Sequence, residues 1–250
     1  MKMKADGLRV AGKQGTMDLT AATPAPFRFF DLPVELRLRV YELTLVVPTA
    51  VDLDPANIRT IAPLLRMFLV SRRVHDEAFR VFYGRNTFRV FPTHGRFFQT
   101  KDPLLARLPP QYRTVITKLE LRLGPGWTRP PRGWVINDRL GLGSMGKVFW
   151  LRIFVDFDPT CHPSFEGFSD RDDFYTVFCV SLLQGLFARV ASLSAVEFDA
   201  DRTVSRSSLL LQSLVNEVKA GNKRITWGSE RGWDKSVDVD VADVLQKMSL

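Results

Sequence analysis

The segment from residue 30 to residue 43 constrains this chain most, because a helix-start signal precedes an amphipathic run there. Pro33 suits the first turn of a helix, where its missing N–H costs nothing. Asp31 and Glu35 place negative charge beside the positive end of the helix dipole. A single apolar stripe follows at steps of four, three and four residues, formed by Leu36, Val40, Leu43 and Val47. The sequence therefore predicts an amphipathic helix at this position.

A second amphipathic helix is predicted downstream, ending near Gly84. Its apolar stripe consists of Met67, Val70, Val74, Ala78 and Val81. The segment between the two helices, residues 46–62, contains Pro48 and Pro55. We interpret this segment as an insertion.

The two predicted helices together resemble an F-box. The F-box pattern is a Leu-Pro-x-Glu-Leu helix followed by a helix carrying Val-Cys/Ser-Arg, and residues 32–36 and 70–74 match it. Residues 83–88, Tyr-Gly-Arg-Asn-Thr-Phe, are similar to the tail that follows the second helix in a degenerate F-box-like family expanded in filamentous fungi. The resemblance covers residues 27 to about 91, without the tryptophan that often closes an F-box.

An F-box implies docking on a Skp-type adaptor of a cullin ubiquitin ligase. At the adaptor contact, where buried apolar area supplies affinity, the resemblance places Leu32, Pro33, Leu36 and Val40. Arg72 and Arg73 are expected at the rim of this contact. The implied role is that of a non-enzymatic substrate-recognition subunit whose later strands and loops hold an unknown protein. A helical cap without adaptor binding is the alternative interpretation of the same residues.

Beyond residue 91 the chain alternates short strand-like and helix-like segments. Period-two alternation predicts strands at residues 118–123, 150–157, 195–199 and 237–241. Helices are predicted at about 174–190, after a capping signal at 169–172, and before Gly221. We therefore expect a mixed α/β fold with parallel βα units. An irregular layer and a leucine-rich-repeat-like layer are equally compatible with the uneven strand spacing.

Three parts follow from these patterns: a flexible tail at residues 1–26, the F-box-like helical module at 27–91 and an α/β recognition region at 92–250. Only two cysteines occur in 250 residues, which makes no disulfide framework. No apolar run approaches the roughly 18–20 residues that span a bilayer. We expect no membrane association and an intracellular location, in the cytoplasm and/or the nucleus.

Residues 141–148 satisfy the Gly-x-Gly-x-x-Gly-x-Val spacing of a kinase phosphate loop. No His-Arg-Asp or Asp-Phe-Gly motif accompanies them, and a phosphoryl-transfer site needs both. Of the histidines, only His162 adjoins a cysteine, Cys161, and this pair does not have the spacing of a zinc site. We therefore expect no enzyme activity, no cofactor and no metal.

The net charge of +8 is concentrated in one region, because residues 59–118 hold twelve Lys or Arg against three acidic residues. Arginines interleave with aromatic residues there. In a nucleic-acid-binding alternative, phosphate contacts would come from Arg66, Arg80, Arg85, Arg89 and Arg96. Aromatic residues at helical spacing usually serve a core, and an acidic protein partner would suit the same arginines. Two alternatives to a ligase subunit remain: a ligase-independent protein-binding scaffold and a basic nucleic-acid-binding protein.

Overall fold

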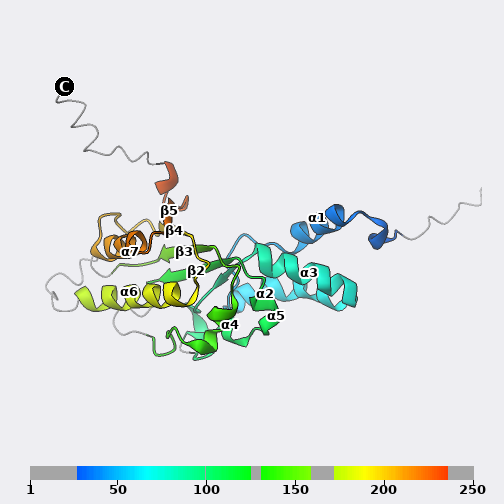
Figure 1. Cartoon of the computed structure of the whole chain (residues 1–250), viewed down its shortest axis with the longest axis horizontal. Helices are drawn as coiled ribbons and strands as arrows, with labels where there is room; N and C mark the ends of the chain where they lie inside the picture. Colours follow the sequence, from blue (N-terminus) through cyan, green and yellow to red (C-terminus); the bar gives the residue numbers. More distant parts are fainter. Residues whose placement is uncertain (1–26, 99, 125–130, 159–171, 236–250) are drawn as a thin grey trace, which may run out of the picture.

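The computed structural model describes residues 27–98, 100–124, 131–158 and 172–235. Within them the fold is mixed α/β, as predicted: a group of helices leads into a parallel sheet with further helices along it (Figure 1). The tail at 1–26, the strand predicted at 237–241 and most of the capping signal at 169–172 lie outside the described residues.

The N-terminal module contains α1 (Val34–Leu45), α2 (Pro55–Leu65) and α3 (Arg72–Arg85). Short 3-10 turns, η1 (Phe29–Asp31) and η2 (Arg66–Leu69), precede α1 and α3. Side chains cap two of the helices: Asp54 accepts hydrogen bonds from the backbone N–H groups at the start of α2, and Ser71 accepts one at the start of α3. Pro33 lies one residue earlier than predicted, immediately before α1.

Residues 46–62, which the sequence presents as an insertion, are part of the module. Pro55 is the first residue of α2, a position that suits proline. Upstream of it, Val51 pairs in parallel with Phe88. The N–H of Val51 donates to the carbonyl of Thr87 at 2.8 Å, and the N–H of Arg89 donates to the carbonyl of Val51 at 3.0 Å. The segment therefore supplies both a helix and an edge contact to the sheet.

The sheet consists of parallel strands that are neighbours in chain order. The strands are β1 (Thr87–Arg89), β2 (Lys118–Leu123), β3 (Trp150–Val155), β4 (Ala195–Ala200) and β5 (Arg224–Trp227). This confirms the strands predicted near 118, 150 and 195 and the parallel βα arrangement.

Helices of different lengths connect the strands. They are α4 (Leu104–Arg107), α5 (Pro110–Arg113), α6 (Asp172–Arg189) and α7 (Leu209–Ala220), with 3-10 turns η3 (Gly95–Phe97), η4 (Asp138–Leu140), η5 (Leu142–Ser144) and η9 (Trp233–Lys235). Helix α7 ends before Gly221, as predicted. Helices α6 and α7 lie side by side along the sheet (Figure 1).

Residues 174–190 are apolar nearly all round, a pattern that predicts a buried helix, but α6 is buried on one side only. Tyr175, Cys179 and Leu183 are buried, but Phe174 is 47% exposed and Val177 is 63% exposed. The apolar composition of this segment does not reveal that only one side of the helix packs on the core.

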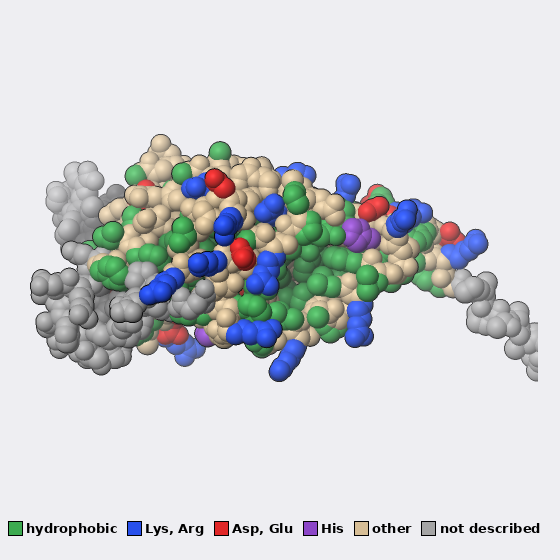
Figure 2. Space-filling model, turned by 90° about the horizontal axis from the view of Figure 1, so that it is seen from below, with side chains coloured by type: hydrophobic (Ala, Val, Ile, Leu, Met, Phe, Trp, Pro, Cys, Tyr) green, Lys and Arg blue, Asp and Glu red, His purple; other side chains and the backbone are tan. Residues whose placement is uncertain are grey.

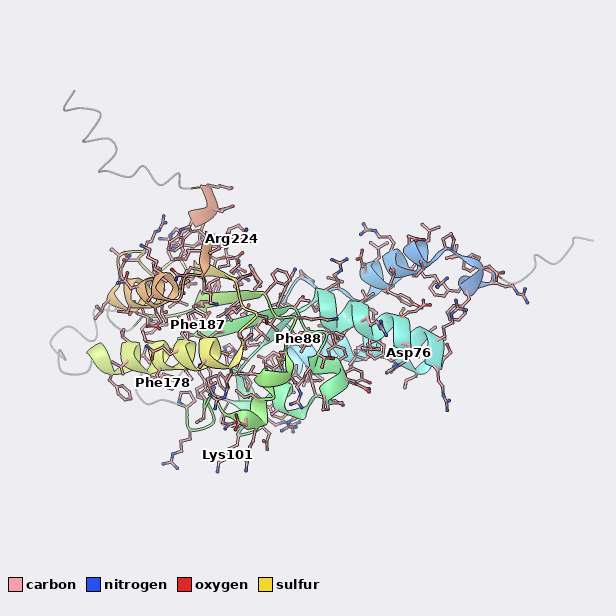
Figure 3. The ribbon with its side chains drawn as sticks, in the orientation of Figure 1. Asp76, Phe88, Lys101, Phe178, Phe187 and Arg224 are labelled. Carbon is pink, nitrogen blue, oxygen red and sulfur yellow. The ribbon has the colours of Figure 1, made fainter. Side chains whose placement is uncertain are left out.

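The module and the sheet share one core. β1 lies within the range predicted for the module, residues 27–91, yet it pairs with β2. Phe88 on β1 is fully buried, and the centroid of its ring lies 5.9 Å from that of Phe82 and 5.5 Å from that of Tyr83 on α3. Figure 3 shows Phe88 at the junction of the two parts. Buried residues form a continuous cluster from Tyr41 to Trp233 across this junction.

Helix α1 packs on α3 through an unusual set of side chains: Arg37, Tyr41 and Leu45 are buried. The Nε and Nη2 atoms of Arg37 each donate to a carboxylate oxygen of Glu77 at 2.9 Å. Arg37 also donates to the carbonyl of Leu32. These hydrogen bonds from Arg37 lower the pKa of Glu77. The ion pair therefore fixes the rotation of α1 about its own axis.

Asn86 joins the C-terminal ends of the same two helices. Its side chain is buried; the Nδ2 atom donates to the carbonyls of Leu45 and Phe82 at 2.9 and 3.0 Å, and the Oδ1 atom accepts from the N–H of Val47 at 2.8 Å. A buried backbone group that loses its hydrogen-bond partner costs roughly 1–3 kcal/mol.

We expect Asn86→Ala to lower the free energy of unfolding by about 2–4 kcal/mol, because the carbonyl of Leu45 and the N–H of Val47 lose their partner. The carbonyl of Phe82 loses one hydrogen bond but still accepts from the backbone N–H of residue 86. Urea denaturation measures this change. Gln111→Ala, an exposed position on α5, is the control and should stay within about 0.5 kcal/mol of the wild type. If Asn86→Ala also changed the free energy of unfolding by less than about 0.5 kcal/mol, Asn86 would not stabilise the ends of α1 and α3.

The ion pair between Arg37 and Glu77 makes stability depend on pH. A carboxylate whose folded pKa lies below its unfolded value of about 4.3 stabilises the fold above that value. This contribution is lost as the pH falls through the folded pKa. We expect Glu77→Gln to lower the free energy of unfolding at pH 7, and the deficit to shrink below a pH of about 4. Denaturation curves across this range, compared with those of Glu35→Gln, test it; a deficit independent of pH would refute the assignment.

Candidate functional site

The outer face of α1, defined here as Leu36, Val40 and Leu43, is apolar and exposed to solvent. The relative exposures of these residues are 52%, 37% and 70%. The opposite side of the helix carries Arg37 and Tyr41 into the contact with α3. Three residues of the predicted stripe are therefore on one side of α1, but this side faces away from the core. Val47, the fourth, lies beyond the end of the helix and packs against the core. Such an exposed apolar face is a feature of interaction sites.

Two more exposed apolar residues follow η2: Leu69 is 84% exposed and Val70 is 71% exposed. The Oγ1 atom of Thr44 on α1 lies 3.9 Å from the Sδ atom of Met67, which brings η2 against α1. Val70 was predicted in the apolar stripe of the second helix, and this assignment is wrong. The helix begins after Ser71, so Val70 precedes it and does not share its buried side.

Val74, Ala78 and Val81 of the predicted stripe are buried on α3, as expected. Met67, which was predicted in the same stripe, lies in η2 before the helix and is only partly buried. The N-terminal ends of α1 and α3 meet at the other predicted adaptor residues. Leu32 is half-buried, whereas Pro33 is exposed.

Arg72 and Arg73, predicted at the rim, begin α3 and are exposed. The guanidinium of Arg73 lies 4.3 Å from the centroid of the Phe30 ring, and its Nε atom lies 3.5 Å from a carboxylate oxygen of Glu77. Arg37 and Arg73 thus bind the same carboxylate. The structure brings Leu32 and Arg73 together at this end of α1, and the outer face extends from there along the helix.

The arginines of the nucleic-acid alternative divide into two groups. Exposed positions are held by Arg66, Arg80, Arg85 and Arg96. Arg89 is different: its side chain is 11% exposed and donates to Asp52 at 2.7 Å and to Glu120 at 2.8 Å. It is held inside the fold by these carboxylates, so it does not belong to a phosphate-binding surface.

Most aromatic residues of the same region pack in the core. Phe97 is an exception: it is half-buried, and the guanidinium groups of Arg96 and Arg107 lie 4.8 and 5.6 Å from the centroid of its ring. Phe82, Tyr83, Phe88 and Phe91 are all buried. The ring of Tyr83 stacks on Tyr112, with centroids 4.6 Å apart and planes at 8°. Rings that pack on each other in this way leave no free face for a base.

One face of the sheet carries a row of charged residues, which we call the charged face: Glu120, Arg122, Arg152, Glu197 and Asp199. Arg152 lies at its centre. Its Nη2 atom is 2.8 Å from carboxylate oxygens of both Asp199 and Glu230, and its Nε atom is 3.4 Å from Glu197.

Burial, together with the neighbouring Asp199 and Glu230, raises the pKa of Glu197 despite the opposing charge of Arg152. Arg122 makes a separate bidentate pair with Asp156, at 2.6 and 2.7 Å. The charged face is thus an ordered set of ion pairs on neighbouring strands.

The glycine-rich segment 141–148 is a packed connection. Several of its backbone N–H groups already have partners: Ser144 donates to Gly141, Met145 to Leu142 and Val148 to Met145. Leu142, Met145 and Val148 are buried. Amides that are bonded within the segment cannot cradle a phosphate, and a strand follows the segment where a nucleotide fold has a helix.

The part of the chain that the structure describes contains few groups that could bind a metal ion or act as a nucleophile. There, no group of three or more His, Cys, Asp and Glu residues could hold a metal ion. Cys161 and His162 lie outside that part. Burial raises the pKa of the Cys179 thiol, which keeps it protonated at neutral pH. Among the same described residues, no helix is long and apolar enough to cross a membrane.

The sequence predicts the apolar stripe of α1, but it gives no sign that Leu69 is an exposed surface residue. Helical spacing places Val70 in the apolar stripe of the second helix, although Val70 is exposed. Leu69 and Val70 are exposed because η2 ends at Leu69 and α3 begins only after Ser71. The spacing of apolar residues in the sequence does not encode this boundary. No family model, curated protein or solved structure matches this chain. The resemblance to an F-box therefore depends on the sequence of residues 32–36, 70–74 and 83–88.

Proposed function

We propose that this chain is a non-enzymatic interaction protein whose N-terminal module docks on a Skp-type adaptor through the outer face of α1. The α/β region would then hold a protein substrate for a cullin-type ubiquitin ligase. Such a role would place the protein in the cytoplasm and/or the nucleus. The observation that supports it most is the rotation of α1, which buries Arg37 and exposes Leu36, Val40 and Leu43.

The free energy that such a face can supply is substantial. Fully burying a Leu or Val side chain contributes about 1.5–3 kcal/mol. Apolar residues near the centre of an interface usually carry most of its affinity, while charged residues at the rim influence association. Arg72, exposed at the start of α3, suits such a rim position. Arg73 already contacts Phe30 and Glu77, so it would stabilise the packing of the module and would not bind the adaptor directly.

For the substrate, the charged face offers polar groups in a fixed arrangement, some of which remain partly exposed. Arg122 and Asp156 retain side-chain exposures of 29% and 27%, and Glu230 retains 58%. These groups could exchange their present partners for groups of a bound protein. The substrate itself has no chemical signature in this arrangement.

We expect a tagged chain to recover the Skp-type adaptor and the cullin from a fungal cell extract, and Leu36→Asp/Leu43→Asp to reduce recovery at least tenfold. Quantitative immunoblotting of the purified complexes measures both. Both positions are exposed, so the substitutions leave the core intact, unlike changes at the half-buried Leu32.

Leu209→Asp is the matched control, because Leu209 is 48% exposed and lies at the start of α7. It should retain wild-type recovery, and circular dichroism should show all three proteins folded. Absence of adaptor from the wild-type purification would rule out the ligase assignment and leave a ligase-independent scaffold. Equal recovery with the double variant would show that the outer face of α1 is not the contact.

A further inference from the structure

An apolar groove runs along α2, on the side of the module away from α1. It consists of two cavities of about 190 and 390 Å³ that share Ala62 and Leu65 as lining residues. The first lies between α2 and α4 and is lined also by Ile58, Leu104 and Leu108. The second continues over η2 to Phe68, Leu69, His75 and Tyr112. We call the two cavities together the α2 groove.

The α2 groove is open to solvent and mostly apolar. Figure 2 shows a hollowed hydrophobic area on the face that contains α2, α4 and α5, with Lys and Arg side chains around it. Large apolar side chains line it while remaining exposed: Ile58 is 37% exposed and Leu69 is 84% exposed. An apolar hollow with a polar rim fits side chains that project from a partner.

The charge around the α2 groove is mainly basic. Most of its lining residues belong to the region 59–118, which holds twelve basic and three acidic residues. Asp52, which lines the first cavity, is buried and paired with Arg89. Arg66 lines the second cavity, and Figure 3 places Lys101 beside α4. A partner with carboxylates around its apolar residues would be attracted to this rim, whereas a basic partner would be repelled.

Two other kinds of partner fit less well. Nucleic acid would need free aromatic faces for stacking, but Phe82 and Tyr83 are buried and Tyr112 stacks on Tyr83. A membrane surface binds apolar residues that protrude into it, and the α2 groove is a hollow. Two cavities in a row instead suit two apolar side chains spaced along one chain segment.

We propose that the α2 groove binds an acidic segment of a protein partner that inserts one apolar side chain into each cavity. This goes beyond the adaptor proposal and does not depend on it, because residues of α1 line neither cavity. The groove is a second docking surface on the same module, with Ala62 and Leu65 between the two anchor positions.

The test uses the full chain and two fluorescein-labelled peptides of about 12 residues, long enough for three helical turns. Each peptide carries Leu at positions i and i+4, one for each cavity; the remaining residues are Glu in the acidic peptide and Lys in the basic one. We expect fluorescence anisotropy to show at least tenfold tighter binding of the acidic peptide, with affinity falling as salt is raised.

The variant Ala62→Glu places a carboxylate where the two cavities meet, and we expect it to weaken binding of the acidic peptide at least tenfold. Ala56→Glu is the matched control: it makes the same change on the same helix, at an exposed residue that lines neither cavity, and its affinity should stay within twofold of the wild type. Hydrogen exchange should slow at residues 55–69 and 104–108 in the complex, and thermal unfolding should confirm that both variants fold.

Equal binding of the two peptides, undetectable binding of the acidic peptide, or an unchanged affinity in Ala62→Glu would each overturn the proposal. Tight binding to anionic lipid vesicles or to single-stranded DNA that Ala62→Glu abolishes, without binding of the acidic peptide, would assign the groove to one of those partners instead. None of these outcomes changes the adaptor test, which depends on Leu36 and Leu43.

Discussion

The pair formed by Arg37 and Glu77 determines which side of α1 meets the rest of the molecule. An arginine turned toward the core must have a partner there, since an unpaired charge would be costly to bury. Glu77 provides both carboxylate oxygens, and the carbonyl of Leu32 accepts a further hydrogen bond. Desolvation offsets much of the attraction in such a pair, so its main effect is to select one orientation of the helix. That orientation leaves Leu36, Val40 and Leu43 in solvent.

The module is rigidly continuous with the sheet because they share backbone hydrogen bonds and a core. Val51 and Phe88 pair at the edge of the sheet, and Phe88 packs under α3. Asn86, immediately before β1, binds backbone groups at the ends of both α1 and α3. A partner bound on the outer face of α1 would therefore be held at a fixed orientation relative to the charged face.

Much of the fold was predictable because local patterns and tertiary packing agree. The strand at 118–123 alternates apolar and polar residues, and its apolar set faces the core while Glu120 and Arg122 join the charged face. The buried part of the α3 stripe, Val74, Ala78 and Val81, has helical spacing. Predictions from the sequence were wrong where one local pattern is compatible with two structures. Pro55 is typical of an inserted loop, but proline also suits the first position of a helix, and Pro55 occupies that position in α2. The apolar composition of α6 indicates burial, yet Val177 is exposed.

The sequence by itself determined most of the elements: the amphipathic stripe of Leu36, Val40 and Leu43, the end of α7 before Gly221, the strands near 118, 150 and 195, and the local excess of arginine. It did so because helix and strand periods and capping chemistry act over a few residues. Only the tertiary structure decided which surfaces are available to partners. The apolar stripe of α1 faces solvent because Arg37 pairs with Glu77, forty residues away in the chain. Arg89 is held inside the fold by its ion pairs with Asp52 and Glu120. The α2 groove exists because α4 lies beside α2. Such contacts join distant residues, and no local pattern in the chain encodes them.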